Sequence, residues 1–443
     1  MKNGKVFLWS IVVALGGFLF GFDTAVISGA EQAIQQYWKL TPLEHGLTIS
    51  IALIGTIIGS LFGSIPSDRL GRRTTLIIIA LTYLIASVGT AVAANWYVFL
   101  FFRLLGGLGV GASSVTAPVY ISEIAPASKR GRLVGMFQFN VVFGIVTSYF
   151  SNYIIGQDGE TAWRWMLGVQ AFPSFLFFVM LQLVPDSRRW LILKRGKTEE
   201  ARHILKTIDP EHFEKTLAGI TTNRENLKKA DQKSPLLSRR YKFPVFLAFA
   251  FAVFNQVSGI NAIIYYAPRI FEMTGLGRSS SLLSTAGIGL VNFVFTLIAI
   301  NFIDKIGRRT LMIIGSIGLI VTLGLVARAF YLHDFGSWDV TIYLLVYIAF
   351  FAFSQGAVIW VFISEIFPTE VRAKGQTLGS TTHWTMAAII AFTFPYLAEK
   401  AGGGHTFSFF AVMMVLQLIF VWKLMPETKG KSLEQIGHTL VLH

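Results

Sequence analysis

The chain has 443 residues, of which 53% are hydrophobic and only 14% are charged. Soluble proteins carry about 25% charged residues, so the composition excludes an ordinary soluble protein and indicates a polytopic membrane protein. The sequence contains no cysteine, which excludes disulfides and thiolate metal sites. A formal net charge of +14 is compatible with a nucleic-acid partner, but its distribution along the chain favours another interpretation.

Twelve apolar stretches follow one another along the chain, each near the roughly 20 residues that cross a bilayer. The first is longer than the apolar region of a signal peptide and lacks a small-residue cleavage site, so we expect it to be retained as a membrane span. The predicted spans cover residues 6–30, 45–66, 74–94, 97–120, 131–155, 164–184, 243–272, 280–303, 310–330, 340–363, 374–399 and 404–425.

Placing the N-terminus in the cytoplasm brings most of the 38 lysines and arginines to the cytoplasmic side. The basic clusters DRLGRR, SKRGR, DKIGRR and VRAK, the 185–242 segment and the tail all fall there. The positive charge therefore orients the protein in the lipid bilayer, and we expect no nucleic-acid partner.

The longest polar segment, residues 185–242, divides the chain. Its stretches KTEEARHILKTI and PEHFEKTLAGITTNRENLKKA combine helical spacing of apolar residues with mixed charge, which predicts short amphipathic helices. We expect an N-terminal six-helix bundle over 1–184, a cytoplasmic linker over 185–242, a C-terminal six-helix bundle over 243–425 and a cytoplasmic tail over 426–443.

Three motifs recur in the two halves at a separation of about 240 residues. SDRLGRRTTL at 67–76 matches IDKIGRRTLM at 303–312, and ISEIAPASKRGR at 121–132 matches ISEIFPTEVRAK at 363–374. VPDSRRWL at 184–191 matches MPETKGKSL at 425–433. This repeat predicts two bundles related by an axis along the membrane normal.

The repeated motifs place arginines and carboxylates on the cytoplasmic face of both bundles. Arg72 or Arg73 is expected to pair with Glu123, and Arg308 or Arg309 with Glu365. Networks of such pairs that close the two bundles together would bias a conformational equilibrium, although exposed pairs are individually weak. The alternative is that the arginines only orient the chain. The predicted cytoplasmic gate comprises Arg72, Arg73, Glu123, Arg130, Asp304, Arg308, Arg309, Glu365 and Arg372.

At these motifs the sequence resembles the sugar porter family of the major facilitator superfamily, which includes glucose facilitators and bacterial sugar–proton symporters. The resemblance covers nearly the whole chain and rests on motifs in a fixed order, among them GFLFGFDTAVISG, RLLGGLGVG, PVYISEIAP, NQVSGINAIIYYAP, SEIFPTEVR and PETKGKSLEQI. It implies an all-α membrane protein with twelve transmembrane helices in two pseudo-symmetric six-helix bundles, the major facilitator fold, with short cytoplasmic helices. It also implies sugar transport by alternating access.

The seventh span carries three amides, Asn255, Gln256 and Asn261, around a predicted helix break at Ser258–Gly259. Amides offer donor and acceptor together, which suits a sugar's hydroxyl groups, although amides in membrane helices also join helices to one another. The resemblance implies further roles: hydroxyl ligands at Gln138, Gln256, Asn261 and Asn292, ring contacts at Trp360 and Trp384, and outer closure by Tyr265 and Tyr266.

Two positions depart from the family pattern. Asn255 stands where the family commonly has glutamine, and His383 stands where it often has glutamine or asparagine. His383 is either a polar wall residue or a proton carrier. The predicted substrate-binding residues are Phe20, Gln138, Asn255, Gln256, Asn261, Tyr265, Asn292, Gly356, Trp360, His383 and Trp384.

Asp23 is an ionisable residue inside the first apolar span, where an unpaired charge is costly. Arg103 lies inside the fourth span at a matching depth, about 10 Å below the same surface at the helical rise per residue. Phe20 is three residues before Asp23, on the same helix face. We therefore expect an ion pair that Asp23 leaves when it takes a proton. In the family the symporters have this aspartate, whereas the facilitators typically have asparagine.

These observations predict a proton-coupled symporter that imports a monosaccharide, a hexose or a pentose, by alternating access. A passive facilitator is the first alternative, and a membrane sugar sensor is disfavoured by the short tail. The sequence has no nucleotide motif, metal cluster or catalytic triad among its membrane residues, so we expect neither an enzyme nor a cofactor. We expect a functional monomer, located in a bacterial inner membrane with both termini in the cytoplasm.

Overall fold

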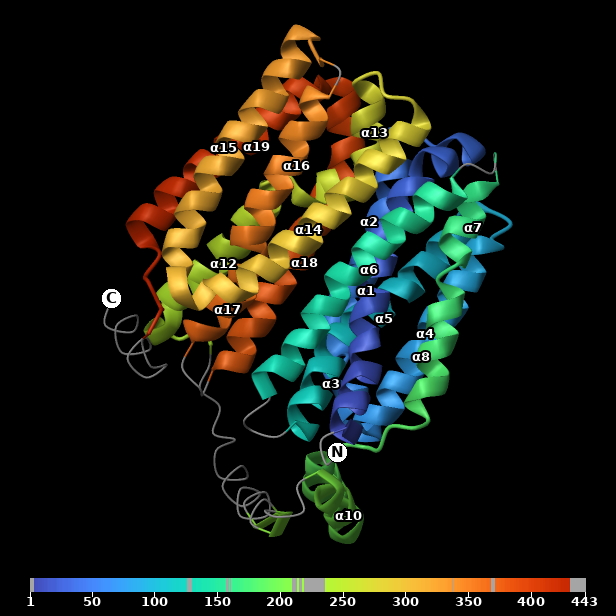
Figure 1. Ribbon diagram of the computed structural model, residues 1–443, viewed down its shortest axis with the longest axis vertical. Helices are drawn as coiled ribbons and strands as arrows, with labels where there is room; N and C mark the ends of the chain where they lie inside the picture. The colour runs from blue at the N-terminus through green and yellow to red at the C-terminus, as the bar shows by residue number, and fades with distance from the viewer. Residues whose placement is uncertain are drawn as a thin grey trace. The chain divides into compact units, whose positions relative to one another are not determined.

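The computed structural model describes residues 4–125, 130–156, 159, 161–208, 213–214, 217–218, 236–336, 338–367 and 371–430. All regular elements in these ranges are helices (Figure 1). The first half contains α1 Gly4–Trp38, α2 Pro42–Phe62, α3 Ser64–Leu70, α4 Arg72–Ala91, α5 Trp96–Ile124, α6 Arg130–Ile155, α7 Ala162–Gly168, α8 Ala171–Leu181, α9 Arg188–Trp190, η2 Leu191–Arg195 and α10 Thr198–Ile208. The second half contains η3 Arg239–Tyr241, α12 Lys242–Val257, α13 Ile260–Met273, α14 Arg278–Ile306, α15 Arg308–Leu332, α16 Asp339–Phe351, η4 Ala352–Gly356, α17 Ala357–Glu365, α18 Arg372–Lys400 and α19 Gly402–Leu424.

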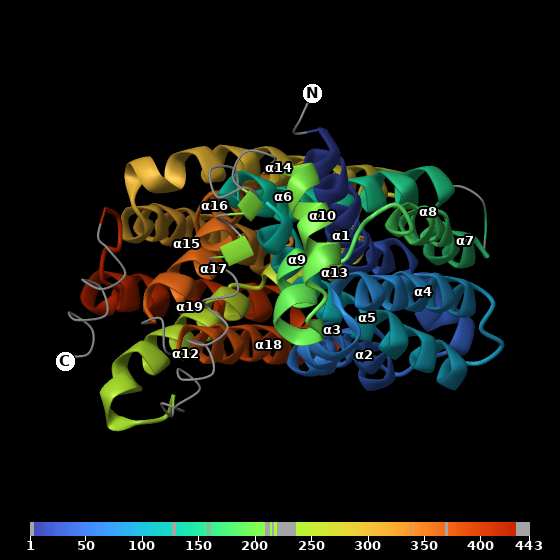
Figure 2. The ribbon, with the colours of Figure 1, turned by 90° about the horizontal axis from the view of Figure 1, so that it is seen from below.

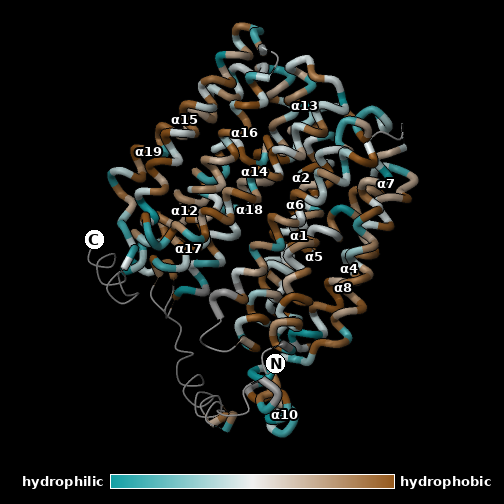
Figure 3. The backbone as a smooth tube through the Cα atoms, in the orientation of Figure 1, coloured by the Kyte–Doolittle hydropathy of each residue, from teal (hydrophilic) through white to brown (hydrophobic). Residues whose placement is uncertain are grey.

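Ten helical segments of the described chain are long and apolar enough to cross a membrane. The helices at the predicted fifth and eleventh spans, α6 with 26 residues and α18 with 29, are equally long but more polar. α1 is longer than the predicted span, because it continues from residue 30 to Trp38. Hydrophobic residues run along α15 and α19, whereas α10 alternates between hydrophobic and hydrophilic residues (Figure 3).

The chain divides into two compact units. The first comprises Met1–Thr24, Gly55–Ile145 and Leu167–Lys233, and the second comprises Ala25–Ile54, Val146–Met166 and Ser234–His443. α1, α2 and α6 therefore each contribute to both units. The predicted boundaries at 184, 242 and 425 follow the sequence repeat and stay a prediction.

In the first unit, small residues let helix backbones approach closely. A side chain at Gly59 of α2 would collide with the backbone of Leu108 in α5, and one at Gly21 of α1 would collide with the backbone of Val141 in α6. α4 also packs along α5 (Figures 1 and 2). These contacts fix the helices that carry Asp23 and Arg103.

The predicted break in the seventh span is confirmed. α12 ends at Val257 and α13 begins at Ile260, and Gly259 between them has φ of 87°, a left-handed conformation that favours glycine. The hydroxyl of Tyr347 in α16 donates a hydrogen bond of 2.9 Å to the carbonyl oxygen of Ser258, which satisfies a backbone group that the break leaves free. In the same unit, α15 packs along α19 and α12 along α18.

The first predicted amphipathic helix of the linker forms as α10. Its buried residues Ala201, Ile204 and Leu205 lie on one face at helical spacing. The second predicted helix, over 210–230, lies almost entirely outside the described residues.

Candidate functional site

Asp23 of α1 and Arg103 of α5 form a buried ion pair in the first unit. The Arg103 Nη1 atom lies 3.1 Å from Asp23 Oδ1, and the two residues are 4% and 6% exposed. Arg103 Nε is also buried and has no hydrogen-bond partner in the described part of the chain. The two side chains are therefore joined by a single hydrogen bond and not by a bidentate ion pair, so they separate more easily.

Two predicted sugar ligands also belong to the first unit. Phe20 lies one helical turn before Asp23 on α1, and its ring centroid is 6.5 Å from that of Phe137 in α6. Gln138 follows Phe137 and is half-buried. The structure therefore places an aromatic ring on the helix that carries Asp23, and an amide on α6, next to the phenylalanine that faces this ring.

In the second unit, the broken helix carries a chain of hydrogen-bonded amides. Asn261 Nδ2 donates to Gln256 Oε1 at 2.6 Å, and Gln256 Nε2 donates to Asn255 Oδ1 at 2.9 Å. Gln256 Nε2 also lies 3.1 Å from His383 Nδ1 on α18. Asn255 and Gln256 are buried, and their side-chain amides hydrogen-bond to one another.

Aromatic rings line the same cluster. The ring centroid of His383 is 4.9 Å from those of Trp360 in α17 and Trp384 in α18. Tyr265 is buried on α13, whereas Asn292 on α14 and Gly356 at the end of η4 are half-buried. The amides and the rings together supply donors, acceptors and apolar faces, which is the chemistry that a sugar ring requires.

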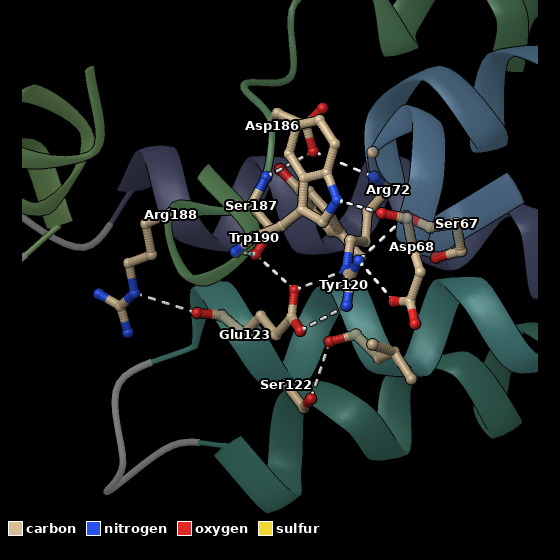
Figure 4. Close-up of polar contacts among 12 residues, drawn as sticks. Ser67, Asp68, Arg72, Tyr120, Ser122, Glu123, Asp186, Ser187, Arg188 and Trp190 are labelled. Atoms are coloured by element: carbon tan, nitrogen blue, oxygen red, sulfur yellow. Dashed lines mark hydrogen bonds and ion pairs between the residues drawn. The ribbon is translucent and has the colours of Figure 1, made fainter. Parts of the chain in front are cut away.

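In the first unit, Arg72 forms an ion pair with Glu123 (Figure 4). Arg72 Nε donates to Glu123 Oε2 at 3.0 Å, and Nη2 donates to Oε1 at 3.2 Å. The Ser187 hydroxyl donates to the same carboxylate, and Arg72 Nη1 contacts Asp68 at 3.0 Å. Of the two arginines offered by the motif, Arg72 makes the ion pair, while Arg73 donates to the carbonyl oxygens of Leu181 and Gln182.

The second unit repeats this arrangement. Arg308 Nη2 donates to Glu365 Oε1 at 2.8 Å, and Nη1 lies 2.8 Å from Asp304 Oδ1. Thr428 occupies the role of Ser187 and donates to Glu365 Oε2 at 2.6 Å. Arg309 donates to the carbonyl oxygen of Trp422.

Each of these two ion pairs joins residues of the same half, so neither pair holds the two halves together in this structure. Arg372 donates to the carbonyl oxygen of Phe367. The side chain of Arg130, which was predicted to join the first network, lies outside the described residues.

Two acids, Asp186 and Glu427, cap helix starts, a role that the sequence motifs did not predict. Asp186 Oδ1 accepts the backbone N–H groups of Arg72 and Arg73 at 3.1 and 3.3 Å, at the start of α4. Glu427 accepts those of Arg308 and Arg309 at 3.0 Å, at the start of α15. Their recurrence in VPDSRRWL and MPETKGKSL was the available signal, but it did not reveal which atoms they bind.

The sequence analysis also did not predict the polar cluster in which buried Glu31 and His45 contact the partly buried Arg269. Glu31 lies one residue after the predicted end of the first span. The longer α1 of the structure brings this residue into the helix.

The sequence profile of the family described as "Sugar (and other) transporter" matches residues 9–440. The chain belongs to this sugar transporter family. It is 37% identical over 439 residues to the arabinose-proton symporter of Bacillus subtilis (strain 168), covering 98% of this chain and 94% of that protein. It is 35% identical over 476 residues to the D-xylose-proton symporter of Escherichia coli (strain K12), covering 98% of this chain and 96% of that protein.

The fold of this transporter is similar to the inward open conformation of the xylose transporter XylE from E. coli. The TM-score is 0.86 at 32% sequence identity, and the match covers 98% of this chain and 100% of that chain. The predicted fold class is confirmed: an all-α membrane protein with twelve transmembrane helices in two pseudo-symmetric six-helix bundles and short cytoplasmic helices. The protein is a multi-pass membrane transporter, not an enzyme.

Proposed function

We propose that this transporter is a proton-coupled symporter that imports a monosaccharide by alternating access. Relatives that match nearly the whole chain are named as symporters of arabinose and of D-xylose with protons. The observation that carries the proposal is the buried Asp23–Arg103 pair, because neither charge is stable alone in the membrane.

Protonation of Asp23 supplies a coupling step. The neutral acid no longer attracts Arg103, and the single contact between them breaks at little cost in geometry. A conformation that binds the protonated acid better than the ion pair is then favoured. The proton and the conformational change are linked in this way, and sugar binding biases the same equilibrium.

We assign sugar recognition in the second unit to the amide chain and its rings. Gln256 and Asn261 would exchange their mutual hydrogen bonds for bonds to sugar hydroxyls, and Trp360 and Trp384 would contact the ring's C–H faces. Asn255, His383, Tyr265, Asn292 and Gly356 complete this wall, while Phe20 and Gln138 are the proposed contributions of the first half. Glu123 and Glu365, with their arginines, are the proposed cytoplasmic gate.

The test is sugar uptake into proteoliposomes with and without an imposed pH gradient. The purified transporter should accumulate labelled sugar above equilibrium only when the gradient is present. Asp23→Asn should abolish accumulation while sparing equilibrium exchange. Glu199→Gln makes the same acid-to-amide change at a linker carboxylate with an 82% exposed side chain, so this variant should accumulate sugar normally.

A passive facilitator is the competing function. It would equilibrate the sugar with no response to the gradient, and Asp23→Asn would then leave uptake unchanged. Binding measured across glucose, galactose, xylose, fructose and arabinose identifies the substrate. We further propose that the monomer is functional and resides in a bacterial inner membrane with cytoplasmic termini.

A further inference from the structure

Glu31 of α1 lies at the centre of a second buried charge cluster, entirely within the second unit. Arg269 of α13 forms a bidentate ion pair with its carboxylate: Nε donates to Oε1 at 2.9 Å, and Nη2 donates to Oε2 at 2.7 Å. His45 of α2 approaches from the other side, with Nε2 2.6 Å from the same Oε2. Gln35 accepts a further hydrogen bond from Arg269.

The cluster joins the two sequence halves. Glu31 and His45 belong to the half that precedes the linker, whereas Arg269 belongs to the half that follows it. The side chains of Glu31 and His45 are completely buried, and that of Arg269 is 22% exposed. The Glu31–Arg269 contact must therefore break whenever α13 separates from α1 and α2.

One polar atom of the cluster lacks a partner. His45 Nδ1 is buried and makes no hydrogen bond in the described part of the chain. A structural ion pair between Glu31 and Arg269 would not need this histidine, and an unsatisfied buried polar atom costs about 1–3 kcal/mol. The static ion pair therefore leaves the presence of this histidine unexplained.

The charged and titratable groups around His45 come from two helices. Glu31 faces it from α1, and α13 contributes Arg269, the ring of Tyr266 at a centroid distance of 6.0 Å, and Glu272, which interacts with Glu31 and Arg269. From α18, the backbone of Phe392 packs against Gly46, next to His45. Arg269 Nη2 lies only 3.4 Å from His45 Nε2, so a protonated histidine would repel the arginine.

We propose that His45 and Glu31 form a second proton-binding site, in which Arg269 and the proton alternate as the cation that neutralises Glu31. With Arg269 in place, neutral His45 donates its Nε2 hydrogen to Glu31, and the cluster carries no net charge. When Arg269 leaves, a proton adds to the lone pair of His45 Nδ1, and an imidazolium–carboxylate pair restores neutrality. Both cations together would leave a net positive charge in a buried site.

The proton site itself does not depend on the proposed symport, but its effect on transport rests on that proposed function. Each separation of Arg269 from Glu31 takes up one proton, and each return releases it. A low pH on the side of the membrane from which the proton reaches His45 therefore favours the conformation in which α13 is separated from α1 and α2. The site adds a pH-dependent step beside Asp23.

The direct test is NMR of the transporter labelled with nitrogen-15 in its histidine rings, recorded as a function of pH in detergent or nanodiscs. The chain has eight histidines, and His45→Gln identifies the signal of His45 by its loss. Arg269→Gln removes the competing cation, so the His45 imidazolium should form at a pH higher than in the wild type by at least about one unit. Glu31→Gln should shift its formation to lower pH.

Two variants control for damage to the fold. Arg269→Lys keeps the positive charge and should leave the His45 titration near that of the wild type. Glu44 is the acid next to His45 in the sequence, and its carboxylate accepts a hydrogen bond from the backbone N–H of Thr41. Glu44→Gln should leave the titration of His45 unchanged. If the His45 signal titrates at one pH in all variants, or does not titrate in Arg269→Gln, the proposal is wrong.

A transport measurement separates this inference from the proposed function. In proteoliposomes, His45→Gln should remove one ionisation from the pH profile of uptake, whereas Asp23→Asn should abolish gradient-driven accumulation. Loss of symport with an intact NMR response would overturn only the proposed function. Asp23-dependent accumulation with no coupling between His45 and Arg269 would overturn only the second proton site.

Discussion

Asp186 provides a test of how the start of α4, with the Arg72–Glu123 ion pair, is held together. Its Oδ1 atom accepts backbone hydrogen bonds from Arg72, Arg73 and Ser187 at 3.1, 3.3 and 2.7 Å. Alanine at this position removes the acceptor for all three N–H groups, two of which begin α4. An N-terminal cap contributes about 1 kcal/mol, and the third bond adds to this, so Asp186→Ala should lower the free energy of unfolding by about 2–3 kcal/mol.

The oxygen, rather than the charge, should account for most of this effect. Burial raises the pKa of Asp186 above its ordinary value of 3.8, although the N–H groups of Ser187, Arg73 and Arg72 oppose the shift. The folded protein therefore binds the proton more readily than the unfolded chain does. The stability linked to this proton is fully present below pH 3.8 and is lost as the pH rises through the raised pKa. Asp186→Asn keeps the accepting oxygen and should cost less than about 1 kcal/mol.

The assay is denaturation of the purified protein followed by the fluorescence of its 10 tryptophans, since the absence of cysteine excludes thiol-reactive dyes. Asp68→Ala is the matched control, because it removes a carboxylate with a 52% exposed side chain that contacts the same arginine. It should change stability by less than about 1 kcal/mol. Equal destabilisation by Asp186→Asn and Asp186→Ala, or none by Asp186→Ala, would refute the reasoning.

Three other predictions follow from the second unit. Gly259→Ala forces a left-handed residue against the Phe410 ring and should cost at least about 1–2 kcal/mol, whereas Gly324→Ala enters open space and should be neutral in the same denaturation assay. Tyr347→Phe loses the bond to the Ser258 carbonyl and should cost about 1 kcal/mol, and an unchanged melting temperature would contradict this. Gln256→Ala should weaken sugar binding measured by calorimetry about tenfold, while the buried Gln417→Ala, outside the proposed site, should leave the affinity unchanged.

Residues whose positions follow from helical geometry could be predicted from the sequence. Asp23 and Arg103 were expected to meet because both lie at the same depth in their spans, and the structure brings them to 3.1 Å. The break at Ser258–Gly259 was expected because glycine beside polar residues interrupts an apolar run, and Gly259 adopts the left-handed conformation there.

Contacts that depend on tertiary packing could not be predicted. The motif offered two arginines for Glu123, and only the path of the backbone at the start of α4 decides that Arg72 points to it. His45 and Arg269 are separated by 224 residues, and each alone reads as an ordinary residue near a span end. Only the packing of α13 against α1 and α2 shows that they share the Glu31 carboxylate.

The sequence repeat between the two halves preserves the caps at the starts of α4 and α15. Glu427 caps the start of α15 by accepting hydrogen bonds of 3.0 Å from the backbone N–H groups of Arg308 and Arg309, as Asp186 caps α4. The glycine before each helix has a similar positive φ, of 99° at Gly307 and 102° at Gly71. Both caps accept the two N–H groups that begin their helix, and Glu427 also accepts those of Thr428 and Lys429. Glu427→Ala should therefore destabilise the protein by at least the roughly 2–3 kcal/mol of Asp186→Ala.

The membrane interior does not repeat in this way. Asp23 and Arg103 form a charge pair in the first half, whereas the seventh span supplies amides and the tenth a tryptophan. We therefore expect variants of the two caps to change stability to a similar extent, and variants of Asp23 and Gln256 to change different steps of transport. Asp23→Asn should remove coupling with little change in sugar affinity, and Gln256→Ala should lower affinity while the remaining uptake still responds to the pH gradient. Loss of both properties in both variants would show that Asp23 and Gln256 do not act in separate steps of transport.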